Sequence, residues 1–274
     1  MKQNRRKPAE KIVNYNLTVG LIITLFMASA ALLSQFWTPY STTQMDSSAV
    51  NMAPCLLHPM GTDNFGRDVL SRVMNGSGIT FITAVCSVGI GAFFGILIGA
   101  VTGYYGGILD EIVMGINNII LAFPSVLLAL IFISLLGPGT ENLIAALGIL
   151  YIPGFARIVR SEFIRCRDLD FVRSARVMGV SSGRIIFFHI LPNTAVSILT
   201  TAAVTFNNAV LSEAGLSYLG LGIQPPIPSL GRMLSEAQSY LMTAPWYALF
   251  PGIIIIVIIL GFSMVGEGLR EMEN

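Results

Sequence analysis

The chain has 274 residues, of which 54% are hydrophobic and 11% are charged, and its mean hydropathy is +0.73. Soluble domains carry about 25% charged residues, so this composition excludes a soluble globular protein and predicts an integral membrane protein. The net charge of +1 excludes neither acidic nor basic partners, but most of the basic residues fall into two clusters. These are Lys2, Arg5, Arg6, Lys7 and Lys11 at the N-terminus, and Arg157, Arg160, Arg165, Arg167, Arg173, Arg176 and Arg184 in the centre. The positive-inside rule places both in the cytoplasm. Topology therefore explains the arginines, and without interleaved aromatic residues they do not indicate nucleic-acid binding.

A first membrane span is predicted near residues 17–36, which are free of charge and long enough to cross a bilayer. The basic start and the sequence Ala28-Ser29-Ala30 also resemble a signal peptide with its cleavage site. The apolar run continues past that site through Leu33, which favours a retained helix. We therefore expect residues 1–16 to form a cytoplasmic tail and residues 38–77 to lie outside.

The outer segment ends with HPMGTDNFGRDVLSRVMNG, residues 58–76. Residues 63–68 lack the acidic order and closing Glu of a calcium loop, so a helix that begins after a capping Asp68 is favoured. Cys55 and His58 form an isolated C-x-x-H, for which a plain turn is favoured over a metal site. With Cys86 and Cys166 far away, no disulfide framework or paired zinc motif is indicated.

The second predicted span, near residues 78–104, contains glycine at every fourth position, namely Gly91, Gly95, Gly99 and Gly103. Small residues at this spacing share one helix face and allow another backbone to approach closely. Gly89-x-Gly91 could suggest a nucleotide loop, but no strand precedes it. The pattern therefore predicts helix packing.

Two further spans are predicted near residues 113–136 and 143–159. Pro124 is able to kink the first, and Pro153-Gly154 can bend the second. A fifth span is expected near residues 194–216 and a sixth near residues 247–265. An outer loop rich in Gly and Pro separates these two and is expected to fold back over the outer mouth. The expected fold is all-α, with six membrane helices and both termini inside.

Four polar residues in or near these spans are candidates for lining a passage: Asn117, Asn207, Asn208 and Glu213. A carboxylate within a span is costly and indicates a functional role by default. The alternative is that these side chains bond to neighbouring helices or, for Glu213, reach outer water.

The central segment, residues 168–193, is the long charged interlude in an otherwise apolar chain and reads DLDFVRSARVMGVSSGRIIFFHILPN. It predicts two short helices, the first capped by Asp170 and the second capped by Ser181 or Ser182 and broken by Pro192. Gly179 is expected to terminate the first helix in a left-handed conformation. Phe171, Ala175 and Met178 fall on one apolar face, which needs either a partner or the lipid surface.

This segment resembles the coupling loop of binding-protein-dependent ABC importer permeases, whose pattern is Glu-Ala-Ala, three residues, Gly, and later Ile-x-Leu-Pro. Arg173, Ser174 and Ala175 stand at the Glu-Ala-Ala positions, so Arg173 reverses a charge of the pattern. Gly179 matches the glycine, and Ile190, Leu191 and Pro192 stand at its end. Residues 58–72 and 212–234 and the closing Gly266-Glu267-Gly268-Leu269-Arg270 are similar to motifs of the peptide and nickel branch.

The resemblance implies the type I importer permease fold, with a core at residues 78–266, the first helix and outer segment at 17–77, a coupling loop at 160–193 and a cytoplasmic tail at 267–274. It implies a multi-pass protein of a bacterial or archaeal cell membrane. Its partners would be a second permease in a heterodimer, two cytoplasmic ATP-binding subunits and an extracytoplasmic solute-binding protein. The implied cargo is short peptides, with nickel or a metal chelate as the alternative.

The chain lacks the G-x-x-x-x-G-K-[ST] motif of nucleotide-binding loops, and its only lysines are Lys2, Lys7 and Lys11. We therefore expect no enzyme activity and no cofactor in this chain, with ATP and Mg bound by partner subunits. No protease or lipase motif is present either. A passive channel or ion-coupled carrier is disfavoured because the spans carry few ionisable relays and such a protein has no use for the central segment.

Overall fold

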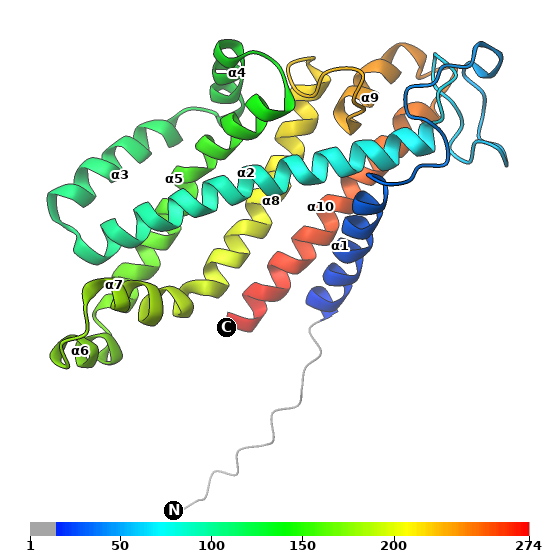
Figure 1. The fold of residues 1–274 in the computed structure, drawn as a ribbon. Coiled ribbons are helices and arrows are strands. Elements are labelled where there is room, and N and C mark those ends of the chain that lie inside the picture. The colour runs from blue at the N-terminus through cyan, green and yellow to red at the C-terminus, as the bar shows by residue number, and fades with distance from the viewer. Residues whose placement is uncertain (1–14, 274) are drawn as a thin grey trace, which may run out of the picture.

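The computed structural model describes residues 15–273, so the basic cluster and most of the tail predicted for residues 1–16 lie outside the described residues. The described part is helical and contains no strand (Figure 1). Its α-helices are α1 (Tyr15–Leu33), α2 (Val69–Tyr105), α3 (Gly107–Ala122), α4 (Ser125–Leu136), α5 (Thr140–Arg167), α6 (Asp170–Val177), α7 (Ser182–Arg184), α8 (Ala195–Tyr218), α9 (Leu230–Ala237) and α10 (Trp246–Glu273).

Five helical stretches of the described chain are long and apolar enough to cross a membrane: α1, α2, α5, α10 and the stretch Ser182–Tyr218 that contains α8. A sixth crossing is formed if α3 and α4 are counted together. These two helices are bent by 93° at their junction, so the third span is broken rather than kinked. Pro124 causes the break because it lacks an N–H and forces the preceding Phe123 into an extended conformation, with ψ at 144°.

The expectation that Pro192 breaks the helix after Ser182 is wrong. From α7 the chain winds through a π turn (Ile185–Ile190) and a 3-10 turn (Leu191–Thr194) directly into α8. Pro192 sits in the first positions of the 3-10 turn, where its missing N–H removes no helical hydrogen bond. The central segment from Ser182 onward is thereby continuous with a membrane span.

The four glycines spaced along α2 face α5. A Cβ added to Gly95 would lie 2.4 Å from the Cβ of Phe155, and one added to Gly99 would lie 2.5 Å from the carbonyl oxygen of Ala156. Gly91 and Gly103 are equally crowded by other residues of α5. The closeness of these two backbones therefore requires residues without side chains.

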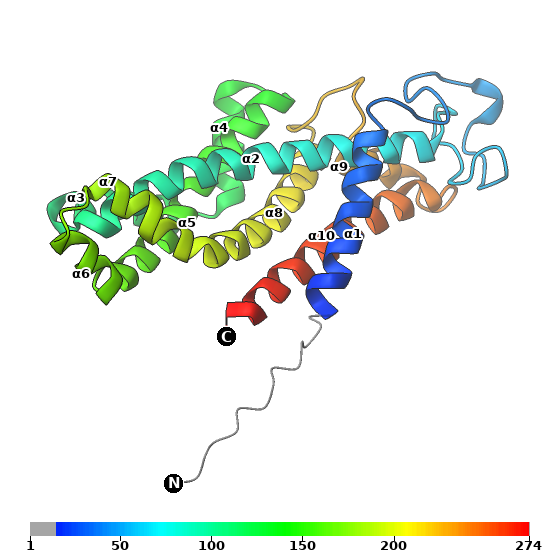
Figure 2. The ribbon, with the colours of Figure 1, turned by 60° about the horizontal axis from the view of Figure 1, so that its bottom comes forward.

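Segments that join the helices gather at two opposite ends of the molecule (Figures 1 and 2). One end, called here the α9 end, contains the loop 34–68 and α9. The other, called the α6 end, contains α6 and α7, and the start of α1 and the end of α10 also point to it. The helix predicted to follow Asp68 is confirmed, because the Asp68 side chain accepts a hydrogen bond from the backbone N–H of Ser71 at the start of α2.

Candidate functional site

A group of buried and partly buried charged residues holds the α9 end together. This ion cluster consists of Asp63, Arg67, Arg72, Arg232 and Glu236. Arg72 bonds to the Asp63 carboxylate, and its other terminal nitrogen lies 3.0 Å from the Glu236 carboxylate. Arg67 contacts the same two acids at 2.7 and 3.2 Å. The cluster therefore ties the loop before α2, the first turn of α2 and α9 into one unit.

Glu236 is the centre of the ion cluster. Besides Arg67 and Arg72, its carboxylate accepts a hydrogen bond of 2.6 Å from the Tyr247 hydroxyl of α10 and lies 3.0 Å from Arg232. Burial raises the pKa of Glu236, but attraction by Arg72 and the hydrogen bonds from Tyr247, Arg72 and Arg232 outweigh it and bring the pKa to about 2. Glu236 is therefore held as a carboxylate.

A second set of contacts pins the beginning of α9. Glu213 of α8 is fully buried, and its carboxylate accepts hydrogen bonds from the hydroxyls of Thr80, Ser217 and Ser229 at 2.6, 2.7 and 2.9 Å. Ser229 is the N-cap of α9. Glu213 thus joins α2, α8 and α9 by hydroxyl groups inside the chain, and it faces none of the described cavities.

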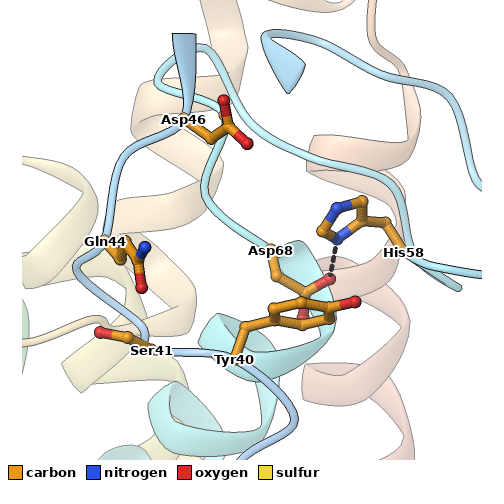
Figure 3. Close-up of a pocket in the computed structure, with 7 residues that line it drawn as sticks. Tyr40, Ser41, Gln44, Asp46, His58 and Asp68 are labelled. Atoms are coloured by element: carbon orange, nitrogen blue, oxygen red, sulfur yellow. Dashed lines mark hydrogen bonds and ion pairs between the residues drawn. The ribbon is translucent and has the colours of Figure 1, made fainter. Parts of the chain in front are cut away.

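A small cavity of about 190 Å³ opens in the loop at the α9 end (Figure 3). His58 Nδ1 lies 2.9 Å from the carboxylate of Asp68, the N-cap of α2, and the Tyr40 ring lies against the imidazole at 4.8 Å between centroids. Cys55 closes a turn with His58, whose backbone N–H donates to the Cys55 sulfur. Within residues 15–273, no group of three or more His, Cys, Asp or Glu side chains is arranged to hold a metal.

The largest described cavity, about 430 Å³, lies where the third span is broken. Leu121, Ser125 and Val126 line it from either side of the α3–α4 break. The rest of the wall comes from α5 and α8, namely Leu150, Tyr151, Gly154, Thr205, Asn208, Leu211 and Ser212. Irregular backbone at membrane depth persists where it lines a cavity, so the break and the cavity belong together. We call this space the membrane cavity.

The structure does not bring the four candidate passage residues together. Asn208 lines the membrane cavity, whereas the neighbouring Asn207 donates a 2.8 Å hydrogen bond to Ser263 of α10. Asn117 is nearly buried on α3, with its amide nitrogen 3.9 Å from the Met114 sulfur. Glu213 is enclosed among hydroxyls. Sequence reasoning did not single out Tyr151 and Ser212, which share the cavity with Asn208, because neither type is unusual in a span.

In the central segment, α6 ends in a Schellman motif. The backbone N–H of Val180 donates to the carbonyl of Ala175, and that of Gly179 donates to Arg176. Gly179 has a φ of +77°, which confirms the predicted left-handed conformation. A Cβ at this position would meet no atom within 4 Å, so glycine is required by the backbone conformation alone.

The residues predicted to form one apolar face of α6 do not share one environment, because Ala175 is buried while Phe171 and Met178 are exposed. Ala175 is only 2% exposed and, with the fully buried Val172, packs against Phe163 of α5 and against Ile185 and Ile190. The expectation that Ala175 is part of an unpartnered face is therefore wrong, because α6 folds back onto its own chain. The start of α6 is also corrected: Leu169 occupies the N-cap position and Asp170 lies in the first turn without a capping hydrogen bond.

Four large apolar residues of the central segment are nevertheless exposed. Val177 is 89% exposed, Met178 75%, Phe188 76% and Phe171 40%. Arg173 and Ser174 are exposed beside them, as is Pro192, whereas Ile190 is buried and Leu191 is partly buried. The segment thus presents apolar side chains on a short helix whose inner face anchors it to α5.

Two arginines of α5 also bond to α3. Arg160 forms an ion pair with Asp110 of α3, one of whose contacts measures 2.6 Å, and Arg157 donates to Asn118 at 3.1 Å. Arg176 of α6 lies over the Tyr104 ring of α2 at 5.1 Å. The α6 end is therefore linked to α2, α3 and α5, but mostly through partly exposed contacts.

Known proteins are similar to this chain over nearly its full length. Residues 95–271 match the family model described as binding-protein-dependent transport system inner membrane component. The dipeptide transport system permease protein DppC of Alkalihalophilus pseudofirmus is 40% identical over 92% of this chain and 83% of its own. The glutathione transport system permease protein GsiD of Pectobacterium atrosepticum is 37% identical over 93% of this chain and 85% of its own.

A solved structure agrees in fold. A chain of the MetNI methionine ABC transporter in an inward-facing conformation superimposes with a TM-score of 0.57, at 19% identity, over 72% of this chain and 96% of that chain. This likeness supports the all-α type I ABC importer permease fold. Together with the family match and the apolar helices, it leads to one conclusion: the chain belongs to the inner membrane components of binding-protein-dependent transport systems and is a multi-pass membrane transport subunit.

Proposed function

We propose that this chain is a permease subunit of an ATP-driven importer of short peptides. The observation that carries the proposal is the 40% identity with a dipeptide permease over 92% of the chain. The second relative is described as a glutathione permease, and glutathione is itself a short peptide. No observation on the described residues favours nickel or a metal chelate over peptides.

In this proposal the α6 end faces the cytoplasm and the α9 end faces outward, with both termini inside. The second arginine cluster, at residues 157–184, lies around α6 and supports this orientation by the positive-inside rule. A second permease subunit would complete the wall of the membrane cavity, and an extracytoplasmic binding protein would deliver cargo to the α9 end.

ATP and Mg would be bound by two separate cytoplasmic subunits. The exposed Phe171, Val177 and Met178 supply an apolar surface for such a subunit, while Val172 and Ala175 transmit its movement to α5. The helical stretch that begins at Ser182 runs without a break into α8, and α6 packs against its Ile185 and Ile190. A push on α6 therefore also reaches a helix that lines the membrane cavity.

The test is ATP-dependent peptide accumulation by the complete transporter in proteoliposomes. We expect uptake of labelled di- and tripeptides when the binding protein, both permeases and the ATP-binding subunits are present, and none without ATP. Accumulation of nickel or its chelates but not of peptides would contradict the proposed cargo. Peptide movement that continues without the ATP-binding subunits would contradict ATP coupling.

A further inference from the structure

The polar groups of the membrane cavity are all neutral. Ser125, Tyr151, Thr205, Asn208 and Ser212 contribute hydroxyl and amide groups, and the remaining lining residues are apolar or glycine. None of the lining residues is Asp, Glu, Lys, Arg or His. The nearest acid along the chain, Glu213, is turned away and bonded to three hydroxyls. This wall therefore offers no counter-charge to an ionic group.

One polar group in the membrane cavity is poorly satisfied. The Tyr151 hydroxyl is buried beside the Ser212 side chain but forms no hydrogen bond of good geometry with any described residue. A buried polar atom without a partner is costly, and the cost is removed when a bound group or water supplies the bond. Asn208 adds both a donor and an acceptor to the same cavity.

A peptide contains one kind of group that matches such a wall. Each non-proline peptide unit has an N–H donor and a C=O acceptor, both neutral and independent of the side chain. Charged side chains and termini, by contrast, find no opposite charge on this wall, so the wall does not select for either sign of charge. A neutral wall with paired donors and acceptors fits the peptide backbone and is indifferent to side-chain charge.

We infer that Tyr151, Asn208 and Ser212 form a subsite that binds the backbone amide of the peptide during passage. This inference rests on the proposed peptide cargo and deepens it. The subsite replaces the hydrogen bonds between one peptide unit and water by hydrogen bonds to the protein. It does not recognise the side chains of the peptide. Discrimination among peptides then has to occur elsewhere in the transporter.

The test combines a substitution in the lining of the membrane cavity with a chemical change in the transported peptide. ATP-dependent uptake of a tripeptide is compared with uptake of an analogue that is methylated on the backbone nitrogen of its central residue. Both are measured for the wild-type complex and for Asn208→Ala and Tyr151→Phe. Each measurement uses the same binding protein at saturation, so any preference of that protein cancels. Asn207→Ala is the matched control, because Asn207 is the adjacent residue and bonds to Ser263 outside the cavity.

We expect the wild type to prefer the unmethylated peptide by at least about fivefold, the equivalent of roughly 1 kcal/mol for one hydrogen bond. Asn208→Ala and Tyr151→Phe should reduce that ratio toward one, whereas Asn207→Ala should leave it unchanged. Lysine-, alanine- and glutamate-containing peptides should be slowed by the same factor in each cavity variant.

Two results separate the possible failures. If the wild-type complex accumulates no peptide at all, the proposed function is wrong. If it accumulates peptides but the methylation ratio is the same in the wild type and in both cavity variants, the subsite is wrong while the proposed function stands. A loss restricted to peptides of one side-chain charge would also overturn the subsite, because a backbone contact cannot produce it.

Discussion

The α9 end and the α6 end differ in how their charged and apolar side chains are held. At the α9 end, charged residues are paired inside the chain: Arg72 is 3% exposed and lies between Asp63 and Glu236, and the buried Glu213 is bonded to three hydroxyls. At the α6 end, the ion pairs are partly exposed, and α6 and the turn after it present Val177 and Met178, which are 89% and 75% exposed. The loop at the α9 end also exposes single apolar residues such as Leu56, so the contrast lies in how the charged residues are held.

In the proposed transporter, this difference would separate a fixed end from an end that docks the ATP-binding subunit. Contacts at the α9 end join α2, α8, α9 and α10, which therefore move together. The central segment has one anchored face, through Val172 and Ala175, and one free face. A force applied to the free face is transmitted to α5 and α8, while the α9 end keeps the opposite ends of α2, α8 and α10 in register.

The largest expected effect is the loss of an arginine from the ion cluster. Arg72→Met leaves Asp63 and Glu236 without the charge that balances them, and we expect a loss of stability of about 3–5 kcal/mol. Arg173→Met in the exposed part of the central segment should change stability by less than about 0.5 kcal/mol. Thermal unfolding of the purified subunit in nanodiscs measures both, and equal melting temperatures would contradict the distinction between the two ends.

Acid should weaken the α9 end. The pKa of Glu236 is depressed from 4.5 to about 2 in the folded chain, so its contribution to stability is fully present above pH about 4.5 and is lost as the pH falls toward 2. Unfolding followed between pH 7 and 2.5 should show this loss. In Glu236→Gln the stability should be lower at neutral pH, and this component of the pH dependence should be absent.

Removing the Glu213 carboxylate should have an intermediate effect. Glu213→Leu leaves the hydroxyls of Thr80, Ser217 and Ser229 without their acceptor, which we expect to cost about 1–3 kcal/mol. Glu213→Gln retains an acceptor oxygen and should cost less. Proteolysis of the loop before α9 in membrane vesicles provides the measurement, and equal protection of wild type and both variants would argue against a role in fixing α9.

A smaller loss of stability is expected from a change at Gly179, together with a large loss of coupling. Gly179→Ala places a Cβ on a residue with φ of +77° and should cost about 1–2 kcal/mol locally. Gly183→Ala is the matched control, because Gly183 also has free space for a Cβ but lies in α7 without a positive φ. Peptide-stimulated ATP hydrolysis by the complete transporter should fall in the first variant only.

Sequence patterns predicted the helical class, the approximate spans and local features of the backbone that depend on a single residue. Asp68 at the start of α2 and Gly179 at the end of α6 are examples, since capping and positive φ are encoded within a few residues. The angle at Pro124 was not predictable, because proline determines where a helix breaks but the packing of α3 and α4 determines how far it turns.

Long-range pairs were also missed. Arg72 and Glu236 are 164 residues apart, and no periodicity brings them together. A signal existed, since Arg67, Arg72 and Arg232 lie outside both basic clusters in a chain with few charges. Ala175 was placed wrongly because helical spacing identifies an apolar face but does not distinguish a partner in the same chain from one outside it.

Site-specific photo-crosslinking can show whether the free face of the central segment contacts an ATP-binding subunit. A photoreactive amino acid is introduced at Met178 or, for comparison, at Leu56, an apolar residue at the α9 end that is even more exposed. We expect an ATP-binding subunit to be crosslinked from position 178 and none from position 56. Crosslinks from position 178 to lipid alone, in a transporter that still hydrolyses ATP in response to peptide, would contradict it.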